Sequence, residues 1–190
     1  MPWDVKQAQP ALASVASAFT GKVLDVGCGT GDNSLWLAQQ AGVTAVYGVD
    51  FAEGALKLAN ERLQALGATP APVHYLQQDV IAMDESLTGF DTLLDSAVFH
   101  CIGDDDAQRR YLAAVTPRCK MGATAVMLVF SDRNLDPYVG PRRIPEAHAR
   151  ALWTEAGWEV ASVNHDCYYK DTMGRNDGKG AHALLMIARR

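Results

Sequence analysis

The sequence of 190 residues has few cysteines and no excess of positive charge. Its four cysteines, at positions 28, 101, 119 and 167, show no Cys-x-x-Cys spacing, which argues against a zinc site or a disulfide framework. No apolar run reaches the length of a membrane span, and the first residues show no signal-peptide pattern. The formal net charge is -5, whereas nucleic-acid-binding proteins usually carry an excess of basic residues. We therefore expect a cytoplasmic protein with reduced thiols, without a metal, a membrane or a nucleic acid as partner.

Hydrophobic residues make up 48% of the chain and charged residues 21%, which is typical of a globular protein with a real core. The length suits one α/β domain, so we expect a core over 21–190 preceded by an N-terminal lid or helix over 1–20. Short apolar runs alternate with amphipathic stretches, as in βαβ units of a parallel sheet. Parallel strands are predicted at 22–26, 45–50, 73–77, 90–94 and 123–130.

Helices are predicted at 32–40, at 53–66, from 104–106 to a break at Pro117, and at 145–156. The stretches 158–163 and 183–188 are predicted to pair as antiparallel strands, joined by a polar loop at 171–180.

A glycine-rich turn, with Gly27, Gly29 and Gly31, follows the first predicted strand. Glycine lets the backbone and a ligand approach closely, so such a turn in a doubly wound sheet marks a nucleotide site. The dinucleotide fingerprint G-x-G-x-x-G would place its third glycine at position 32, where the chain has Asp32. Two acids around the turn, Asp25 and Asp32, would repel a pyrophosphate. They suit a positively charged ligand without phosphate, such as S-adenosylmethionine, rather than the nicotinamide dinucleotide of an oxidoreductase.

The pattern Asp-x-Gly-x-Gly-x-Gly over residues 25–31 resembles the first motif of the class I S-adenosylmethionine-dependent methyltransferases, and the resemblance extends over essentially the whole chain. It implies a single Rossmann-like, doubly wound α/β domain with seven mainly parallel strands in the order 3-2-1-4-5-7-6 and an antiparallel last strand. It also implies S-adenosylmethionine as cofactor and S-adenosylhomocysteine as product. The cofactor-binding residues that it implies are Asp25, Gly27, Cys28, Gly29, Gly31, Asp50, Phe51, Asp79, Val80, Asp95 and Ser96.

Three of these residues lie at or just after strand ends, at positions where the family binds the nucleoside. Asp50 ends the second predicted strand, where the family's acid accepts hydrogen bonds from both ribose hydroxyls. Phe51 would lie against the adenine, and Asp79, after the third strand, would accept from the adenine amino group. Each alone could be an ordinary strand-end, core or turn residue, but their joint spacing favours the cofactor site.

Methyl transfer from a sulfonium is an in-line displacement, which depends mainly on how acceptor and methyl are aligned. A hydroxyl acceptor must also lose its proton, which a positioned base can take. His100 lies just past the fourth predicted strand, at the carboxyl edge where ligands bind, and histidine titrates near neutral pH. We predict His100 as the catalytic residue; a structural histidine bonded within its loop is the alternative.

Further segments resemble small-molecule methyltransferases. Residues 2–4 with 9–10 resemble the N-terminal lid of enzymes related to the thiopurine and halide/thiol methyltransferases. Residues 95–102, 130–132 and 140–144 resemble a bacterial subgroup that acts on small heterocycles and includes O-methyltransferases of 2-alkyl-1-hydroxyquinolin-4-ones. Substrate contacts are therefore expected from Trp3, Gln9, Phe99, Tyr138 and Arg142. A frayed terminus and a solvated loop are the alternatives.

The sequence thus predicts a methyltransferase, a monomer or homodimer, that modifies a hydroxyl of a small aromatic or heteroaromatic acceptor. Nucleic-acid amino-methyltransferases carry Asn/Asp-Pro-Pro-aromatic after the fourth strand, whereas this chain has Asp-Ser-Ala-Val at 95–98. Methylation of a thiol, a nitrogen or a protein side chain remains an alternative. So does a non-catalytic protein that binds the cofactor.

Overall fold

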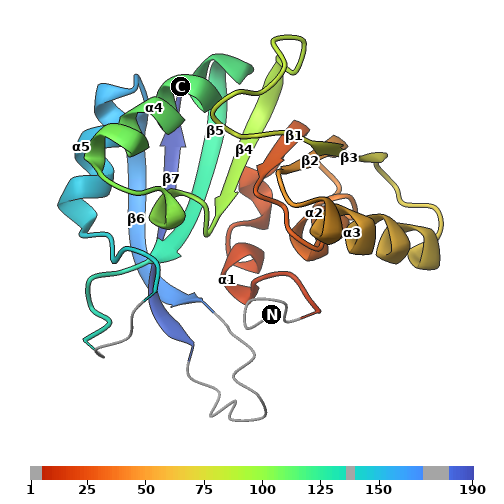
Figure 1. Ribbon diagram of the computed structural model, residues 1–190, viewed down its shortest axis with the longest axis horizontal. Helices are drawn as coiled ribbons and strands as arrows, with labels where there is room; N and C mark the ends of the chain where they lie inside the picture. The colour runs from red at the N-terminus through yellow and green to blue at the C-terminus, as the bar shows by residue number, and fades with distance from the viewer. Residues whose placement is uncertain (1–5, 136–139, 169–179) are drawn as a thin grey trace.

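One seven-stranded sheet forms the centre of the molecule, in the order β3-β2-β1-β4-β5-β7-β6 (Figure 1). The computed structural model describes residues 6–135, 140–168 and 180–190. Strand β7 runs antiparallel to both of its neighbours, β5 and β6, and the other pairings are parallel. The predicted fold class, strand order and antiparallel last pair are confirmed. The strands are β1 (Gly21–Val26), β2 (Val43–Asp50), β3 (Val73–Gln77), β4 (Phe90–Ser96), β5 (Cys119–Phe130), β6 (Glu159–Tyr168) and β7 (Ala181–Arg189).

The helices fall close to their predicted positions, with short turns added. They are α1 (Pro10–Ala13), α2 (Asp32–Leu37), α3 (Glu53–Leu66), α4 (Asp105–Val115) and α5 (Glu146–Glu155), with 3-10 turns η1 (Ala16–Ala18), η2 (Phe99–Cys101) and η3 (Thr116–Arg118). Helix α2 ends three residues before the predicted Gln40, because the amides of Gln39 and Gln40 bond to carbonyls three residues back. Turn η3 contains Pro117, which ends α4 as predicted.

Alternating side chains of the strands separate two apolar layers. Leu24 and Val26 of β1 belong to the layer that contains α4 and α5, whereas Val23 belongs to the layer that contains α1 and α2. Strand β5 repeats this alternation, with Met127 on the first face and Leu128 on the second. In Figure 1, α4 and α5 lie beside the β6 and β7 half of the sheet, and α2 and α3 beside the β1 to β3 half. Both faces of the sheet are thus covered, and its functional groups must lie at an edge.

The order of the strands places a topological switch point, hereafter called the crevice, at the carboxyl ends of β1 and β4. The chain leaves β1 toward β2 on one side and returns from β3 to β4 on the other. Ligands of open α/β sheets bind at such a switch point. Within the described ranges, no helix is long and apolar enough to cross a membrane.

Candidate active site

The glycine turn after β1 has a backbone that only glycine adopts easily. Gly27, Gly29 and Gly31 have φ angles of 61°, 55° and 84°. A Cβ on Gly27 would lie 2.2 Å from a methyl of Val98, and one on Gly31 would lie 2.2 Å from the Tyr75 hydroxyl oxygen. A Cβ on Gly29 would meet nothing within 4 Å. The turn is therefore packed against protein at both ends and faces open space in its middle, as a ligand cradle should.

Three carboxylates gather beneath this turn at the ends of neighbouring strands. Asp25 of β1 is 1% exposed, Asp50 of β2 is 8% exposed and Asp95 of β4 is fully buried. Burial, together with the charges of Asp50 and Asp95, raises the pKa of Asp25 to about 7, although a hydrogen bond from the Ser34 hydroxyl lowers it in part. The site thus concentrates negative charge in a dry environment, which favours a cationic ligand and opposes a pyrophosphate.

Asp50 links the glycine turn to the start of α3. Its Oδ2 accepts a hydrogen bond from the Gly29 amide and its Oδ1 accepts one from the Ala52 amide, each over 2.9 Å. The adjacent Phe51 side chain is 77% exposed, although large apolar side chains are usually buried. A carboxylate with two aligned oxygens beside an exposed ring fits a ribose with its base. The Asp50 carboxylate and the Phe51 ring therefore suit the nucleoside of S-adenosylmethionine.

Three further predicted cofactor residues differ in how far their side chains are buried. Asp79 is exposed, and its Oδ1 accepts from the Ile81 amide over 3.0 Å. Val80 packs partly buried against the core. Cys28 donates its amide to the Val49 carbonyl over 3.0 Å, and burial raises the pKa of its thiol far above the usual range. Its backbone can face a ligand, whereas its thiol stays protonated and inert.

Asp95 binds protein groups rather than facing the crevice. Its oxygens accept from the amides of Val98 and Phe99 and, over 2.7 Å, from the Tyr111 hydroxyl. Burial raises the pKa of Asp95 to about 6, and these hydrogen bonds lower it in part. They cap a turn in which Ala97 adopts a φ of 75°, a conformation that is costly for a residue with a Cβ. The geometry gives Asp95 a structural role, in place of the direct cofactor contact that we predicted.

The geometry of His100 favours the alternative of a structural histidine bonded within the fold over the predicted base. The imidazole is 2% exposed, and its Nδ1 accepts a hydrogen bond from the Phe130 amide over 2.8 Å. An amide N–H can bond only to an unprotonated ring nitrogen, so the neutral ring carries its proton on Nε2. Taking a second proton would produce an imidazolium whose Nδ1–H faces an amide donor. His100 is therefore placed to donate a hydrogen bond, and not to accept the proton of a substrate.

An aromatic cluster, formed by His100, Phe130 and Tyr168, closes the β5 and β6 side of the crevice. The ring centroids of His100 and Phe130 are 4.5 Å apart, and those of Phe130 and Tyr168 are 5.4 Å apart. Burial raises the pKa of the Tyr168 hydroxyl to about 12, a contact with the Ser96 hydroxyl lowers it in part, and the charge of Asp25 also raises it. Tyr168 thus joins His100 and Phe130 from a strand at the far edge of the sheet. Sequence reasoning missed it because strand pairing, not local sequence, brings it there.

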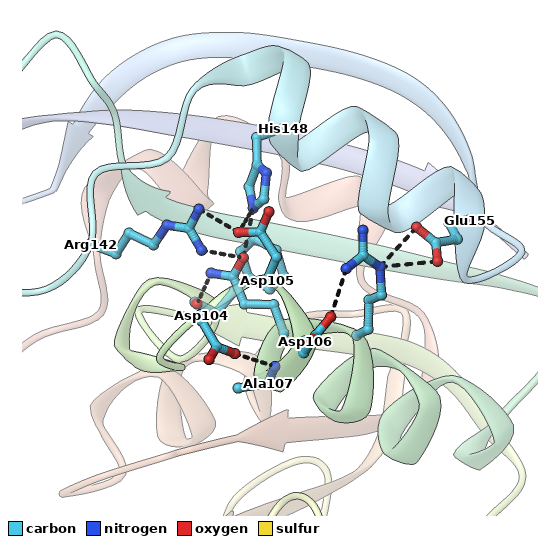
Figure 2. A network of polar contacts seen from close by, with 10 residues as sticks. Asp104, Asp105, Asp106, Ala107, Arg142, His148 and Glu155 are labelled. Carbon is cyan, nitrogen blue, oxygen red and sulfur yellow. Dashed lines mark hydrogen bonds and ion pairs between the residues drawn. The ribbon is translucent and has the colours of Figure 1, made fainter.

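Two of the five predicted substrate residues point away from the crevice. Phe99 is fully buried in the core, where its ring lies 6.3 Å from those of Tyr111 and Trp153. Its neighbour in sequence, His100, occupies the opposite face. Arg142 forms an ion pair with Asp105 over 2.6 Å, beside α4, as Figure 2 shows. In these positions neither side chain faces the switch point, so the geometry does not favour the two substrate contacts, which stay predictions.

The other predicted substrate residues belong to the N-terminal segment and to a loop. Gln9 is buried, and its backbone amide donates to the side-chain oxygen of Asn33, at the start of α2, over 3.1 Å. This contact brings the N-terminal segment next to the glycine turn, so a role for Gln9 stays a prediction. Trp3 and Tyr138 lie outside the described residues.

Asp32 contributes less to the site than the sequence suggested. Its carboxylate pairs with Arg62 of α3 over 2.8 Å and also accepts from the Thr30 hydroxyl. Because Arg62 neutralises it, the charge that would oppose a pyrophosphate comes from the buried acids beneath the turn. Among the described residues, no group of three or more His, Cys, Asp or Glu side chains could hold a metal.

A groove of about 580 Å³ begins two residues beyond Phe130. Its lining combines charged side chains with an exposed leucine: Asp132, Arg133, Leu135, Glu146 and His165.

The strand order, the glycine turn and the strand-end carboxylates together define a Rossmann-like methyltransferase. The sequence profile of the methyltransferase domain family matches residues 23–122, more than half of the chain. The chain therefore belongs to this family. The prediction of a methyltransferase that uses S-adenosylmethionine is confirmed at the level of the family.

Individual relatives extend the likeness over nearly the whole chain. The chain is 29% identical over 184 residues to a 2-heptyl-1-hydroxyquinolin-4(1H)-one methyltransferase of Mycobacteroides abscessus, covering 93% of this chain and 77% of that protein. A solved structure concerned with the conversion of a disulfide bond into a thioacetal group during echinomycin biosynthesis is 28% identical, with a TM-score of 0.82 over 100% of this chain and 85% of that one. An S-adenosylmethionine-dependent methyltransferase of Methanosarcina mazei shares the fold, with 19% identity and a TM-score of 0.76 over 97% and 98% of the two chains.

Proposed function

We propose that the protein transfers the methyl group of S-adenosylmethionine to a hydroxyl oxygen of a small aromatic or heteroaromatic compound. Family membership supports the reaction type. The name of the Mycobacteroides abscessus relative supports an acceptor with a hydroxyl on a heteroaromatic ring. The aromatic cluster beside the cofactor acids is the observation in this chain that carries the proposal, because flat rings pack well against aromatic side chains.

On the cofactor side, each group has a separate task. Asp50 binds the ribose hydroxyls, Phe51 packs on the adenine, and Asp79 accepts from the adenine amino group. Asp25 stays beneath the turn and contributes its negative charge. When bound, S-adenosylmethionine supplies an electrophilic methyl group on a cationic sulfur. The open space at Gly29 lets the backbone approach the cofactor closely.

On the acceptor side, the residues orient the ring and exclude water. Phe130 and Tyr168 form an apolar wall, and the tautomer of His100 makes it a hydrogen-bond donor to an oxygen rather than a base. An acceptor whose hydroxyl ionises near neutral pH needs no base, because the oxyanion is already present. A hydroxyl on a ring nitrogen conjugated with a carbonyl is more acidic than a simple phenol. We therefore favour N-hydroxy heterocycles over unactivated phenols.

Turnover of a matched pair of acceptors tests this proposal. We would incubate the protein and S-adenosylmethionine with 2-heptyl-1-hydroxyquinolin-4(1H)-one and, separately, with the same ring lacking the hydroxyl on nitrogen. The expected result is a product heavier by one methyl group from the first compound only, with one S-adenosylhomocysteine per product. Equal turnover of the two compounds, or no turnover of any aromatic hydroxyl in a wider panel, would contradict the proposal.

Methyl transfer to sulfur is a second candidate. The structure concerned with echinomycin biosynthesis supports it, since the described chemistry converts a disulfide into a thioacetal and that chain matches all of this one. A thiolate is a strong nucleophile at neutral pH, so this reaction needs no base either. Adding aromatic thiols to the panel separates the two candidates: preferential methylation of the thiol over its hydroxyl analogue favours sulfur.

A further inference from the structure

A buried glutamine joins four parts of the chain behind the aromatic cluster. Gln108 of α4 is fully buried, and its Nε2 donates to the Phe99 carbonyl of η2 over 3.0 Å. Its Oε1 faces Nε2 of His148 from α5 over 2.7 Å and accepts from Nη1 of Arg142 over 3.3 Å. A buried amide with partners on both its oxygen and its nitrogen is rigid, because rotating it would leave polar atoms without hydrogen bonds.

These contacts hold the turn that carries His100. The Arg142 amide donates to the His100 carbonyl over 2.9 Å, so Arg142 fixes this turn through its backbone and Gln108 through its side chain. Asp95 caps the same turn from the other side through the Val98 and Phe99 amides. Both carbonyls of the Phe99–His100 pair are thereby fixed, and with them the backbone from which the imidazole extends toward the Phe130 amide.

The ion pair between Arg142 and Asp105 completes the network, which Figure 2 shows over the start of α4. Asp105 lies 3.8 Å from Nε2 of His148, and Arg142 and Arg109 add positive charge near that ring. Burial lowers the pKa of His148, and the charge of Arg142 lowers it further. The Nε2 of His148 carries a proton in the imidazolium and also in one of the two neutral tautomers. The hydrogen bond from His148 to Gln108 therefore does not require His148 to be charged.

We propose that Gln108 is a positioning residue for methyl transfer: it fixes the η2 turn so that His100 and the aromatic cluster hold the acceptor in line with the methyl group. The inference rests on the proposed function for its meaning in catalysis. Independently of catalysis, Gln108, a residue outside the crevice, determines the geometry of the turn that carries His100. In-line displacement is sensitive to small misplacements, so the effect should concentrate on the acceptor.

Kinetics of Gln108→Leu test the proposal. This variant keeps a similar volume but removes all three hydrogen bonds. We expect kcat/KM for the acceptor to fall by about tenfold or more, with the Kd of S-adenosylmethionine within about twofold of wild type. The matched control is Arg109→Ala on the same helix, because Arg109 forms ion pairs with the exposed acids Asp106 and Glu155 and, among the described residues, makes no hydrogen bond to Gln108 or Phe99. An equal loss of acceptor and cofactor binding in Gln108→Leu, or an unchanged kcat/KM, overturns the proposal.

Gln108→Glu adds a pH profile that loss of packing alone would not produce. The introduced carboxylate cannot donate to the Phe99 carbonyl while it is ionised, a form that Arg142 and a protonated His148 favour and that Asp105 opposes, whereas its protonated form has the shape of glutamine and can donate again. We expect the activity of this variant, relative to wild type at each pH, to rise as the pH falls. A ratio that stays constant or falls on acidification contradicts the proposed hydrogen bond.

An NMR measurement separates this inference from the proposed function. Hydrogen exchange of the Phe130 amide, with the Leu24 amide of β1 as reference, reports whether His100 is held, and it requires no turnover. Gln108→Leu should lower the protection of the Phe130 amide by about tenfold relative to Leu24, with no such change in Arg109→Ala. Unchanged protection overturns the positioning role even if methyl transfer is found. Lost protection in a protein that methylates no hydroxyl supports the positioning role and removes the proposed function.

Discussion

The two halves of the crevice are built in different ways. On the cofactor side, three glycines with positive φ form one local turn, and carboxylates at the ends of neighbouring strands lie beneath it. On the acceptor side, the surfaces come from η2, β5 and β6, and side chains such as Gln108 and Asp95 hold them in place. The first half uses backbone geometry and the second uses long-range packing. This difference explains why a reaction type can be shared across a family while the acceptor changes.

The two halves meet where the glycine turn packs on the turn after β4. We expect Gly27→Ala to cost about 2–4 kcal/mol of unfolding free energy, because its Cβ would overlap Val98 and its φ is positive. Gly29→Ala is the control, since it adds only the backbone strain, about 1 kcal/mol. Thermal unfolding measures both changes.

Adding Val98→Ala to Gly27→Ala should recover part of the lost stability, because it removes the overlapping methyl. If Gly27→Ala costs no more than Gly29→Ala, the two turns are not packed as described, and the halves are independent.

Removing the strand-end acid should affect the cofactor side alone. Asp50→Asn leaves one oxygen where the ribose needs two acceptors, so the Kd of S-adenosylmethionine should rise by about 10- to 100-fold. Asp79→Asn, at an exposed position, should change the Kd by only a few-fold. Calorimetric titration gives both values. A larger effect at Asp79 than at Asp50 would mean that the ribose is not bound at the end of β2.

Ionisation of Asp25, the buried acid of β1, should lower the free energy of unfolding. Since the folded pKa of Asp25 is about 7, above its usual 3.8, its contribution to stability is fully present below about pH 3.8 and is lost as the pH rises through 7. Asp25→Asn avoids that loss while its oxygen still accepts from Ser34. The variant should therefore gain stability over wild type with rising pH, by about 2 kcal/mol between about pH 5 and pH 8.

Denaturant unfolding at several pH values measures the gain for Asp25→Asn. The same variant should bind S-adenosylmethionine more weakly. A stability difference that does not change with pH would show that Asp25 is not a buried titrating group.

The acceptor side offers the smallest expected change. His100→Asn places an oxygen where Nδ1 accepts from the Phe130 amide, so the fold should persist. Because the Nδ1 of His100 already accepts from the Phe130 amide, we expect no role as a base, and the acid limb of the kcat profile should stay at the same pH in this variant. His100→Ala is the contrasting variant, since it leaves the Phe130 amide without its acceptor and should cost about 1–3 kcal/mol of stability. Loss of the acid limb in His100→Asn would restore the base assignment.

Sequence reasoning succeeded where local chemistry determines structure. Gly27, Gly29 and Gly31 revealed the turn, and the apolar alternation predicted every strand, because each signal lies within a few residues. Orientation was harder. Phe99 and His100 are adjacent and both are buried, yet Phe99 packs against Tyr111 while His100 packs against Phe130, in a turn that Asp95 caps. Nor could the pairing of Arg142 with Asp105 be predicted, since only the folded chain brings α4 next to residue 142.

Binding of S-adenosylmethionine to the intact chain tests the central claim most directly, that buried carboxylates hold a cationic cofactor at the glycine turn. Calorimetric titration at about pH 6 and about pH 8 should show one site per chain, with an affinity about tenfold higher at the higher pH, because binding a cation requires ionised Asp25. No binding of S-adenosylmethionine, or equally tight binding of a nicotinamide dinucleotide at the same site, would contradict the claim.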